Sequence, residues 1–257
     1  MSDTGSPHRA IRFAGALATA IIATCATPLS ADKARVAVAA NFTQAAQEIG
    51  ALFSKKTPHH AVFSFGSTGT LYTQISQGAP FEIFLAADEE RPKLAIDAGY
   101  GVAGTRFTYA SGKIALYSAD GSRALGADTL KRDDIGKIAI ANPITAPYGA
   151  AAVQTMKALG VYSSLSAKLV QGKNIAQAFQ FVDTANAELG FVALSQVAHR
   201  SRGVHWIVPE RFYTPIRQDA VLLSGGAGND AAKAFLSFLR SPDAEAVKKK
   251  FGYGIGD

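Results

Sequence analysis

The chain of 257 residues carries a formal net charge of +6 at pH 7, and 48% of its residues are hydrophobic. This length suits one large domain or two small ones with cores of their own. The basic residues occur in short, dispersed groups without interleaved aromatic side chains, so the charge does not indicate a nucleic-acid surface. Cys25 is the single cysteine and lies near the start, which excludes disulfides, thiol catalysis and cysteine metal sites from the rest of the chain.

Residues 1–31 are predicted to be a secretory signal peptide. A basic stretch, an apolar and alanine-rich run at 13–27, and small residues at 29–31 that suit cleavage follow one another in that order. A membrane anchor is the alternative, but the apolar run is shorter than the roughly 20 residues that a spanning helix needs. We therefore expect an exported protein that lacks this segment.

Short β-branched or aromatic runs alternate with helical patterns, which predicts an α/β fold with a mostly parallel sheet. The expected strands are 36–40, 62–65, 83–86, 113–118, 138–141, 169–170, 190–193, 204–208 and 220–223. Helices are expected at 42–53, 71–78, 88–99, 150–160 and 175–182, and two more finish the chain. The last is expected to begin at Ser241-Pro242, an N-cap followed by proline at the first helical position.

After three strand-and-helix units the pattern restarts at Lys113, without a low-complexity linker and without an internal repeat. This restart predicts two lobes, with the final segment returning to the first lobe. We assign residues 32–112 and 217–257 to lobe 1 and residues 113–216 to lobe 2.

Four strand-to-helix junctions share one chemical character, because small, neutral residues with hydroxyls or amides dominate them. They lie at 39–43, 66–70, 143–150 and 172–175. Each alone is an ordinary helix cap, since Ser, Thr and Asn cap helices in most proteins. The first three contain no Arg, Lys or His, and Lys173 in the fourth can simply face water. Such a site binds an anion through backbone N–H groups, hydroxyls and helix N-termini rather than through charge.

The junctions belong to a wider pattern of motifs: AANFT after the first strand, FGSTGTL at 65–71, QGAPFEIFLAAD at 77–88, PYG at 147–149 and AELGFV at 187–192. In this order the motifs resemble the periplasmic molybdate-binding proteins of ABC transporters, over essentially the whole chain after residue 31. The resemblance implies a class II periplasmic binding fold, with two α/β lobes, two crossovers and an oxyanion in the cleft. It also implies capture of molybdate, and of tungstate, for delivery to the membrane permease of an ABC transporter.

The same resemblance implies four ligand-binding positions: Asn41, Thr68, Tyr148 and the backbone N–H of Ile175. Thr68 stands where the family usually has Ser, so it keeps the hydroxyl and adds a methyl group that could tighten the pocket. Ser67 is a further candidate, since one hydroxyl of such a turn can face the ligand while its neighbour caps the helix. Tyr148 matches members that donate a phenolic hydroxyl from this loop, and its alternative is a half-buried packing aromatic.

Two alternative functions remain: binding of another tetrahedral oxyanion such as sulfate or phosphate, and a secreted enzyme acting on an oxyanion ester. Phosphoryl transfer needs metal or cationic groups for the developing charge. The histidines are not at metal-ligand spacing, Ser67 lacks a nucleophile elbow, and Asp88 is interpreted as a helix N-cap. We therefore expect a monomeric periplasmic binding protein with no catalytic residue, no cofactor, no nucleic-acid partner and no bare metal cation, the molybdenum being bound as its oxyanion.

Overall fold

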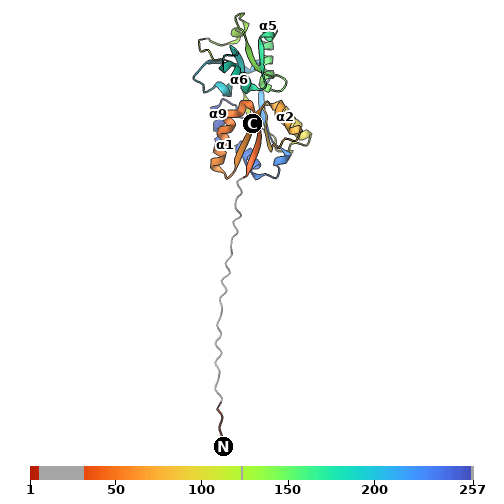
Figure 1. The fold of residues 1–257 in the computed structure, drawn as a ribbon, viewed down its shortest axis with the longest axis vertical. Helices are drawn as coiled ribbons and strands as arrows, with labels where there is room; N and C mark the ends of the chain where they lie inside the picture. Colours follow the sequence, from red (N-terminus) through yellow and green to blue (C-terminus); the bar gives the residue numbers. More distant parts are fainter. Residues whose placement is uncertain (6–31, 123, 256–257) are drawn as a thin grey trace.

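The computed structural model describes residues 1–5, 32–122 and 124–255. The predicted signal peptide falls mainly on residues 6–31, outside the described residues. From Asp32 onward the chain forms two lobes, stacked one above the other in Figure 1, each built on a five-stranded sheet. The lower lobe in this view contains both the first strand and the last helix, so the chain returns to the lobe in which it begins.

The first lobe is built on a sheet with the strand order β2-β1-β3-β10-β4. Its strands are β1 (Lys33–Ala39), β2 (His60–Gly66), β3 (Ile83–Leu85), β4 (Phe107–Gly112) and β10 (Ile216–Leu222). β1 pairs in parallel with β2 and β3, whereas β10 runs antiparallel to β3 and β4.

The second lobe repeats this arrangement in the order β7-β6-β8-β5-β9. Its strands are β5 (Ile114–Ser118), β6 (Ile138–Ala141), β7 (Leu169–Gly172), β8 (Leu189–Ala193) and β9 (Val204–Ile207). β6 pairs in parallel with β7 and β8, and β5 runs antiparallel to β8 and β9.

Both sheets are therefore mixed, and the prediction of a mostly parallel sheet is wrong. Parallel neighbours need a crossover that packs back on their own sheet, but the antiparallel strands β4, β5, β9 and β10 flank the two passages between the lobes instead. β4 leads into β5 through Lys113, and β10 brings the chain back after β9. β4 was not predicted because small and polar residues fill most of its length, Phe107–Gly112. The two passages lie at 113 and 208–215; the lobe ranges assigned from the sequence stay a prediction.

Helices cover both faces of each sheet. In the first lobe they are α1 (Thr43–Lys56), α2 (Thr68–Ser76), α3 (Glu90–Asp97), α8 (Asp230–Phe238) and α9 (Pro242–Lys250). In the second they are α4 (Pro147–Ala158), α5 (Tyr162–Leu165), α6 (Ile175–Asp183) and α7 (Leu194–Val197). Short 3-10 helices lie at η1 (Ala40–Phe42), η2 (Ala127–Lys131), η3 (Ser166–Lys168), η4 (Glu210–Phe212) and η5 (Ser224–Gly226). Within the described ranges, none of these helices is long and apolar enough to cross a membrane.

The apolar first strand is explained by burial on both of its faces. Val36 and Val38 pack with α1, α8 and α9, and Ala37 packs with α2 and α3 on the opposite side of the sheet. A strand that is covered on both faces reads as a continuous apolar run rather than as an alternating one. This packing fixes the position of β1, and with it the position of η1, which follows directly after Ala39.

Helix starts follow local capping chemistry. The Ser241 hydroxyl accepts from the N–H of Ala244 at 3.3 Å, and Pro242 opens α9, which confirms the predicted start. α4 begins at Pro147 rather than at residue 150, because proline is already preorganised for the first helical position. α3 begins at Glu90. Asp88 precedes the helix, and its carboxylate accepts a hydrogen bond from the N–H of Arg91, in the first turn of α3, at 2.9 Å.

Candidate functional site

The four predicted junctions meet at one small cavity between the lobes. β1 and β2 in the first lobe and β6 and β7 in the second all direct their carboxyl ends toward it, the edge at which α/β sheets bind ligands. The residues that line it come from these four strand ends and from β3: Ala39, Ala40, Asn41, Gly66, Ser67, Thr68, Ala87, Ala146, Pro147, Tyr148, Asn174 and Ile175. The structure thus brings all five candidate residues together; their contacts with a ligand stay a prediction.

The cavity is lined entirely by neutral residues. Among its lining residues, all of which the structure describes, none is Asp, Glu, Lys, Arg or His. Lys173, the charged residue of the fourth junction, is exposed and lines a separate, larger hollow outside the cavity. A ligand in the cavity therefore meets dipoles and hydroxyls, and it meets no formal charge on the residues that surround it.

Ser67 and Thr68 have different partners. The Ser67 hydroxyl accepts from the N–H of Thr70 at 3.3 Å and lies 2.7 Å from the Thr70 hydroxyl, so it caps α2. The Thr68 hydroxyl accepts from the N–H of Ala87 at 3.0 Å, which leaves its own hydrogen for another partner. Both residues are buried. Of the two hydroxyls, that of Thr68 is the better placed to donate into the cavity.

Asn41 lies in η1, ahead of α1, and does not cap that helix, whose N-cap residue is Phe42. Its Nδ2 donates to Gln218 Oε1 at 2.8 Å and to the Tyr253 hydroxyl at 3.1 Å. Its backbone carbonyl accepts from the Tyr253 hydroxyl at 2.7 Å and from the Ser195 hydroxyl at 2.9 Å. Since Ser195 belongs to the second lobe, Asn41 is bonded to side chains of both lobes.

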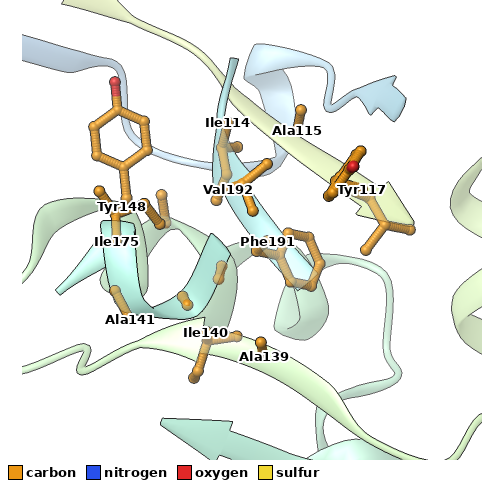
Figure 2. Packing of buried hydrophobic residues seen from close by; sticks show 14 of the residues in the cluster. Ile114, Ala115, Tyr117, Ala139, Ile140, Ala141, Tyr148, Ile175, Phe191 and Val192 are labelled. Carbon is orange, nitrogen blue, oxygen red and sulfur yellow. The ribbon is translucent and has the colours of Figure 1, made fainter. Parts of the chain in front are cut away.

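Tyr148 lies in the first turn of α4 and projects its ring away from the apolar residues of β6, as Figure 2 shows. Its hydroxyl accepts from Gln218 Nε2 at 3.2 Å, and Asn41 Nδ2 lies 3.5 Å away. The ring is almost fully buried, and this burial is the main cause that raises the pKa of Tyr148 well above its ordinary value of 10.0. Tyr148 therefore presents a neutral hydroxyl, and it is more buried than the half-buried packing aromatic of the alternative.

Ile175 is the first residue of α6 and follows the N-cap Asn174. The Asn174 side chain accepts from the N–H of Gln177 at 3.0 Å, which fixes the start of the helix. The first N–H groups of a helix have no partner within the helix and carry its positive dipole end. At Ile175 that backbone donor lies at the wall of the cavity.

A layer of polar side chains behind the cavity was not predicted. Tyr109, Ser195, Gln218 and Tyr253 are all buried and bond Asn41, Tyr148 or one another. Burial raises the pKa of both Tyr109 and Tyr253, so these hydroxyls are also neutral. The sequence holds one signal for this layer, since Gln218 and Asp219 interrupt an otherwise largely apolar strand.

The two lobes touch each other directly beside the cavity. The N–H of Gly69 in α2 donates to the carbonyl of Thr145 at 2.8 Å, and Arg91 Nη2 donates to the carbonyl of Ile144 at 3.1 Å. Arg91 is held in place by an ion pair with Asp88, whose pKa is raised chiefly by burial. These contacts join the first lobe to the 143–146 loop of the second, so the described conformation is a closed one.

The chemistry of the cavity follows from these donors. In residues 32–122 and 124–255, no group of three or more His, Cys, Asp or Glu side chains could hold a metal ion. The donors instead converge from two lobes onto one uncharged space, where hydrogen bonds to an anion are stronger than in water. Fold and site together define a two-lobed binding protein for a small anionic solute.

Comparison with known proteins agrees with this class. The family model of the bacterial extracellular solute-binding proteins matches residues 34–254. The chain is 52% identical over 240 residues to the molybdate-binding protein of Rhodobacter capsulatus, covering 93% of this chain and 95% of that one. It is 49% identical over 252 residues to the molybdate-binding protein of Azotobacter vinelandii, covering 95% and 97% of the two chains. The chain belongs to the bacterial extracellular solute-binding protein family.

A solved structure extends the likeness to three dimensions. The periplasmic molybdate-binding protein of Azotobacter vinelandii superimposes with a TM-score of 0.84 at 36% sequence identity. The match covers 87% of this chain and all of the other. The two-lobed α/β architecture predicted from the motifs is therefore confirmed.

Proposed function

We propose that this protein captures molybdate in the periplasm and delivers it to the permease of an ABC transporter. The observation that carries the proposal is the cavity between the lobes, which is lined by neutral hydrogen-bond donors from four strand ends. The two relatives with about half of their residues identical to this chain are both molybdate-binding proteins, which supports the same ligand here. Tungstate has the same charge and shape, so we propose that it binds as well.

Four residues are proposed to bind the anion, and a fifth supports them. Asn41 and Thr68 act from the first lobe, Tyr148 and the Ile175 N–H act from the second, and Ser67 contributes mainly by capping α2. The Thr68 and Tyr148 hydroxyls both accept N–H bonds from the protein, so each keeps its hydrogen for the anion. The Nδ2 atom of Asn41 already donates to Gln218 and Tyr253. We therefore propose that Asn41 contributes through the backbone of η1 and through the orientation that these two bonds give its side chain.

The same chemistry argues against catalysis. Transfer of a phosphoryl group needs cationic groups or a metal to stabilise the developing charge, and acid–base catalysis needs a titratable side chain within reach. The residues around the cavity are neutral, and the burial of Tyr148 keeps its hydroxyl protonated. We therefore propose a binding protein without enzymatic activity or cofactor, acting as a monomer, with no nucleic-acid partner.

Calorimetric titration of the mature protein with molybdate, tungstate, sulfate and phosphate tests the proposal. Molybdate and tungstate should bind tightly, and at about a thousand times the dissociation constant they should add roughly 4 kcal/mol to the free energy of unfolding. Sulfate and phosphate should bind much more weakly. Tight binding of sulfate or phosphate without molybdate would overturn the ligand assignment and keep the oxyanion class.

Two substitutions test the proposed contacts. Thr68→Val removes a hydroxyl at nearly constant volume, and Tyr148→Phe removes the phenolic oxygen. Each should weaken molybdate binding by about 1.5–3 kcal/mol, the value of a hydrogen bond to a charged group. Thr155→Val is a matched control, since its buried hydroxyl bonds the Ala151 carbonyl within α4 and its loss should leave affinity unchanged.

A further inference from the structure

Gln218 is a fully buried amide in β10, the strand that brings the chain back to the first lobe. It does not line the cavity, so it has no direct contact with the space that a ligand would fill. Burying an amide is costly unless its donors and acceptors find partners. Each partner of Gln218 is therefore informative about why a polar side chain occupies this position.

The two ends of the Gln218 amide face different groups. Its Oε1 accepts from Asn41 Nδ2 at 2.8 Å and from the Tyr109 hydroxyl at 3.1 Å. Its Nε2 lies 3.2 Å from the Tyr148 hydroxyl. An amide nitrogen can only donate, so the phenolic oxygen of Tyr148 accepts this bond and must direct its own hydrogen elsewhere.

We propose that Gln218 is a positioning residue that turns the hydroxyl hydrogen of Tyr148 toward the bound anion. The inference rests on the proposed function, because it explains how the Tyr148 hydroxyl, one of the proposed donors to the anion, is oriented. Gln218 acts through Tyr148 and does not touch the anion itself. In a cavity without charged residues, binding depends on every donor pointing inward, so a residue that sets the direction of one donor affects affinity.

The position of Gln218 also links the two lobes. Gln218 belongs to the first lobe and Tyr148 to the second, and their bond lies against the passage between β4 and β5. A Cβ placed on Gly112 would lie 2.0 Å from the Tyr148 hydroxyl and 2.5 Å from Gln218 Nε2. The backbone at the end of β4, just before the passage, therefore packs directly on the bond that orients Tyr148.

A double-mutant cycle of Gln218→Met with Tyr148→Phe tests the inference. Methionine has a similar length and no N–H, and Asn41 and Tyr109 keep other partners, Tyr253 and the Ala86 carbonyl. Affinities are measured by calorimetry with the anion of the four that binds most tightly, and unliganded melting temperatures are measured in parallel. Tyr117→Phe is the control background, since this buried tyrosine lies in the second lobe and does not line the cavity.

Gln218→Met should weaken binding on the order of tenfold in the wild-type and Tyr117→Phe backgrounds, the effect of about one hydrogen bond. In the Tyr148→Phe background it should weaken binding by less than about twofold, while the melting temperature falls equally in all three. Equal weakening in all three backgrounds would overturn the positioning role and leave the proposed function intact. If Gln218→Met does not fold, Gln218→Leu, which is neutral and also lacks the N–H, serves in the same cycle.

The same measurements test the proposed function independently of the role of Gln218. A cycle that shows coupling with sulfate or phosphate, in a protein without affinity for molybdate, would support the role of Gln218 and overturn the molybdate assignment. Absence of binding by all four anions would overturn both.

Discussion

The N–H of Gly69 donates to the carbonyl of Thr145 at 2.8 Å, which joins α2 of the first lobe directly to the loop before α4 of the second. A Cβ on Gly69 would lie 3.1 Å from the Thr145 Cα and 3.2 Å from its carbonyl oxygen. Such contacts are tighter than ordinary packing. Glycine at this position therefore lets the lobes approach closely beside the cavity.

Gly69→Ala should separate affinity from stability. Alanine stabilises a helix by about 0.5–1 kcal/mol relative to glycine, so the unliganded melting temperature should stay equal or rise. The added methyl group crowds Thr145 only when the lobes are closed, so molybdate binding should weaken by about 1 kcal/mol or more. Melting curves and calorimetry check the two effects. Gly121→Ala is the control, because no atom lies within 4 Å of a Cβ there, and wild-type affinity in Gly69→Ala would contradict the prediction.

Gly112→Ala should weaken molybdate binding by displacing side chains that lie at or behind the cavity. Its Cβ would overlap the Tyr148 hydroxyl and the Gln218 amide, so both side chains must move away from their present positions. We expect a loss of molybdate affinity at least as large as that of Tyr148→Phe, about 1.5–3 kcal/mol. Calorimetry measures it. An affinity equal to that of the wild type would mean that the Tyr148 hydroxyl does not contribute from this position.

Gly149→Ala should instead act mainly on folding. A Cβ at Gly149 would lie 2.2 Å from the backbone carbonyl oxygen of Ala141, so the start of α4 could no longer pack on the end of β6. Overpacking of this kind costs about 1–3 kcal/mol. Denaturant unfolding of the unliganded protein should show this loss, and a stable Gly149→Ala protein would contradict the packing described for α4.

The dependence of stability on alkaline pH follows from four buried tyrosines. Tyr109, Tyr148, Tyr213 and Tyr253 all have a pKa raised above the ordinary value of 10.0, chiefly by burial. In the unfolded chain they lose their protons near pH 10, whereas the folded protein keeps them to higher pH. The folded state then binds more protons, so this contribution to the free energy of unfolding is complete below about pH 10 and is lost as the pH rises further.

Denaturant unfolding across the alkaline range checks this sign. Tyr148→Phe removes one of the four groups and should make the loss of stability above about pH 10 shallower. Lys248, whose pKa is lowered by burial, acts in the opposite direction but only below its ordinary value of 10.5. Because no other titratable side chain lines the cavity, affinity for molybdate should be flat between about pH 6 and 9. A strong pH dependence of binding in that range would contradict an uncharged site.

Association should depend on Lys173. It lines the hollow beside the cavity, next to the ends of β2 and β7. These are edge strands, on the side of the two sheets away from the passage between β4 and β5. Among the described residues that line this hollow, Lys173 is the one that carries a charge. Lys173→Gln should lower the association rate of molybdate by about two- to fivefold at low ionic strength and by less at high salt, with an unchanged dissociation rate.

Stopped-flow measurements at two salt concentrations check this prediction. Lys137→Gln is the matched control. This exposed lysine precedes the amino end of β6, whereas the hollow lies past the carboxyl end of that strand. Equal association rates for the two variants would indicate that Lys173 does not steer the anion.

The sequence by itself was sufficient for the features that arise within a few residues of one another. The Ser241-Pro242 start of α9, the apolar face of α1 and the neutral character of the four junctions all depend on local hydrogen bonds and on helical or strand periodicity. The choice of Asn41, Thr68, Tyr148 and Ile175 as candidate ligand residues, with Ser67 as a further one, came from the resemblance of the motifs to the molybdate-binding family. The sequence did not determine the individual contacts of these residues.

The contacts depend on tertiary packing, because they join residues that are far apart along the chain. Asn41 and Gln218 are 177 residues apart and Gln218 and Tyr148 are 70 apart, yet they share one buried network. Likewise, the antiparallel course of β4 and β10 follows from the passages between lobes and not from their own residues. Local patterns encode which groups can donate a hydrogen bond. Only the packing of two lobes against each other sets the direction in which each group donates.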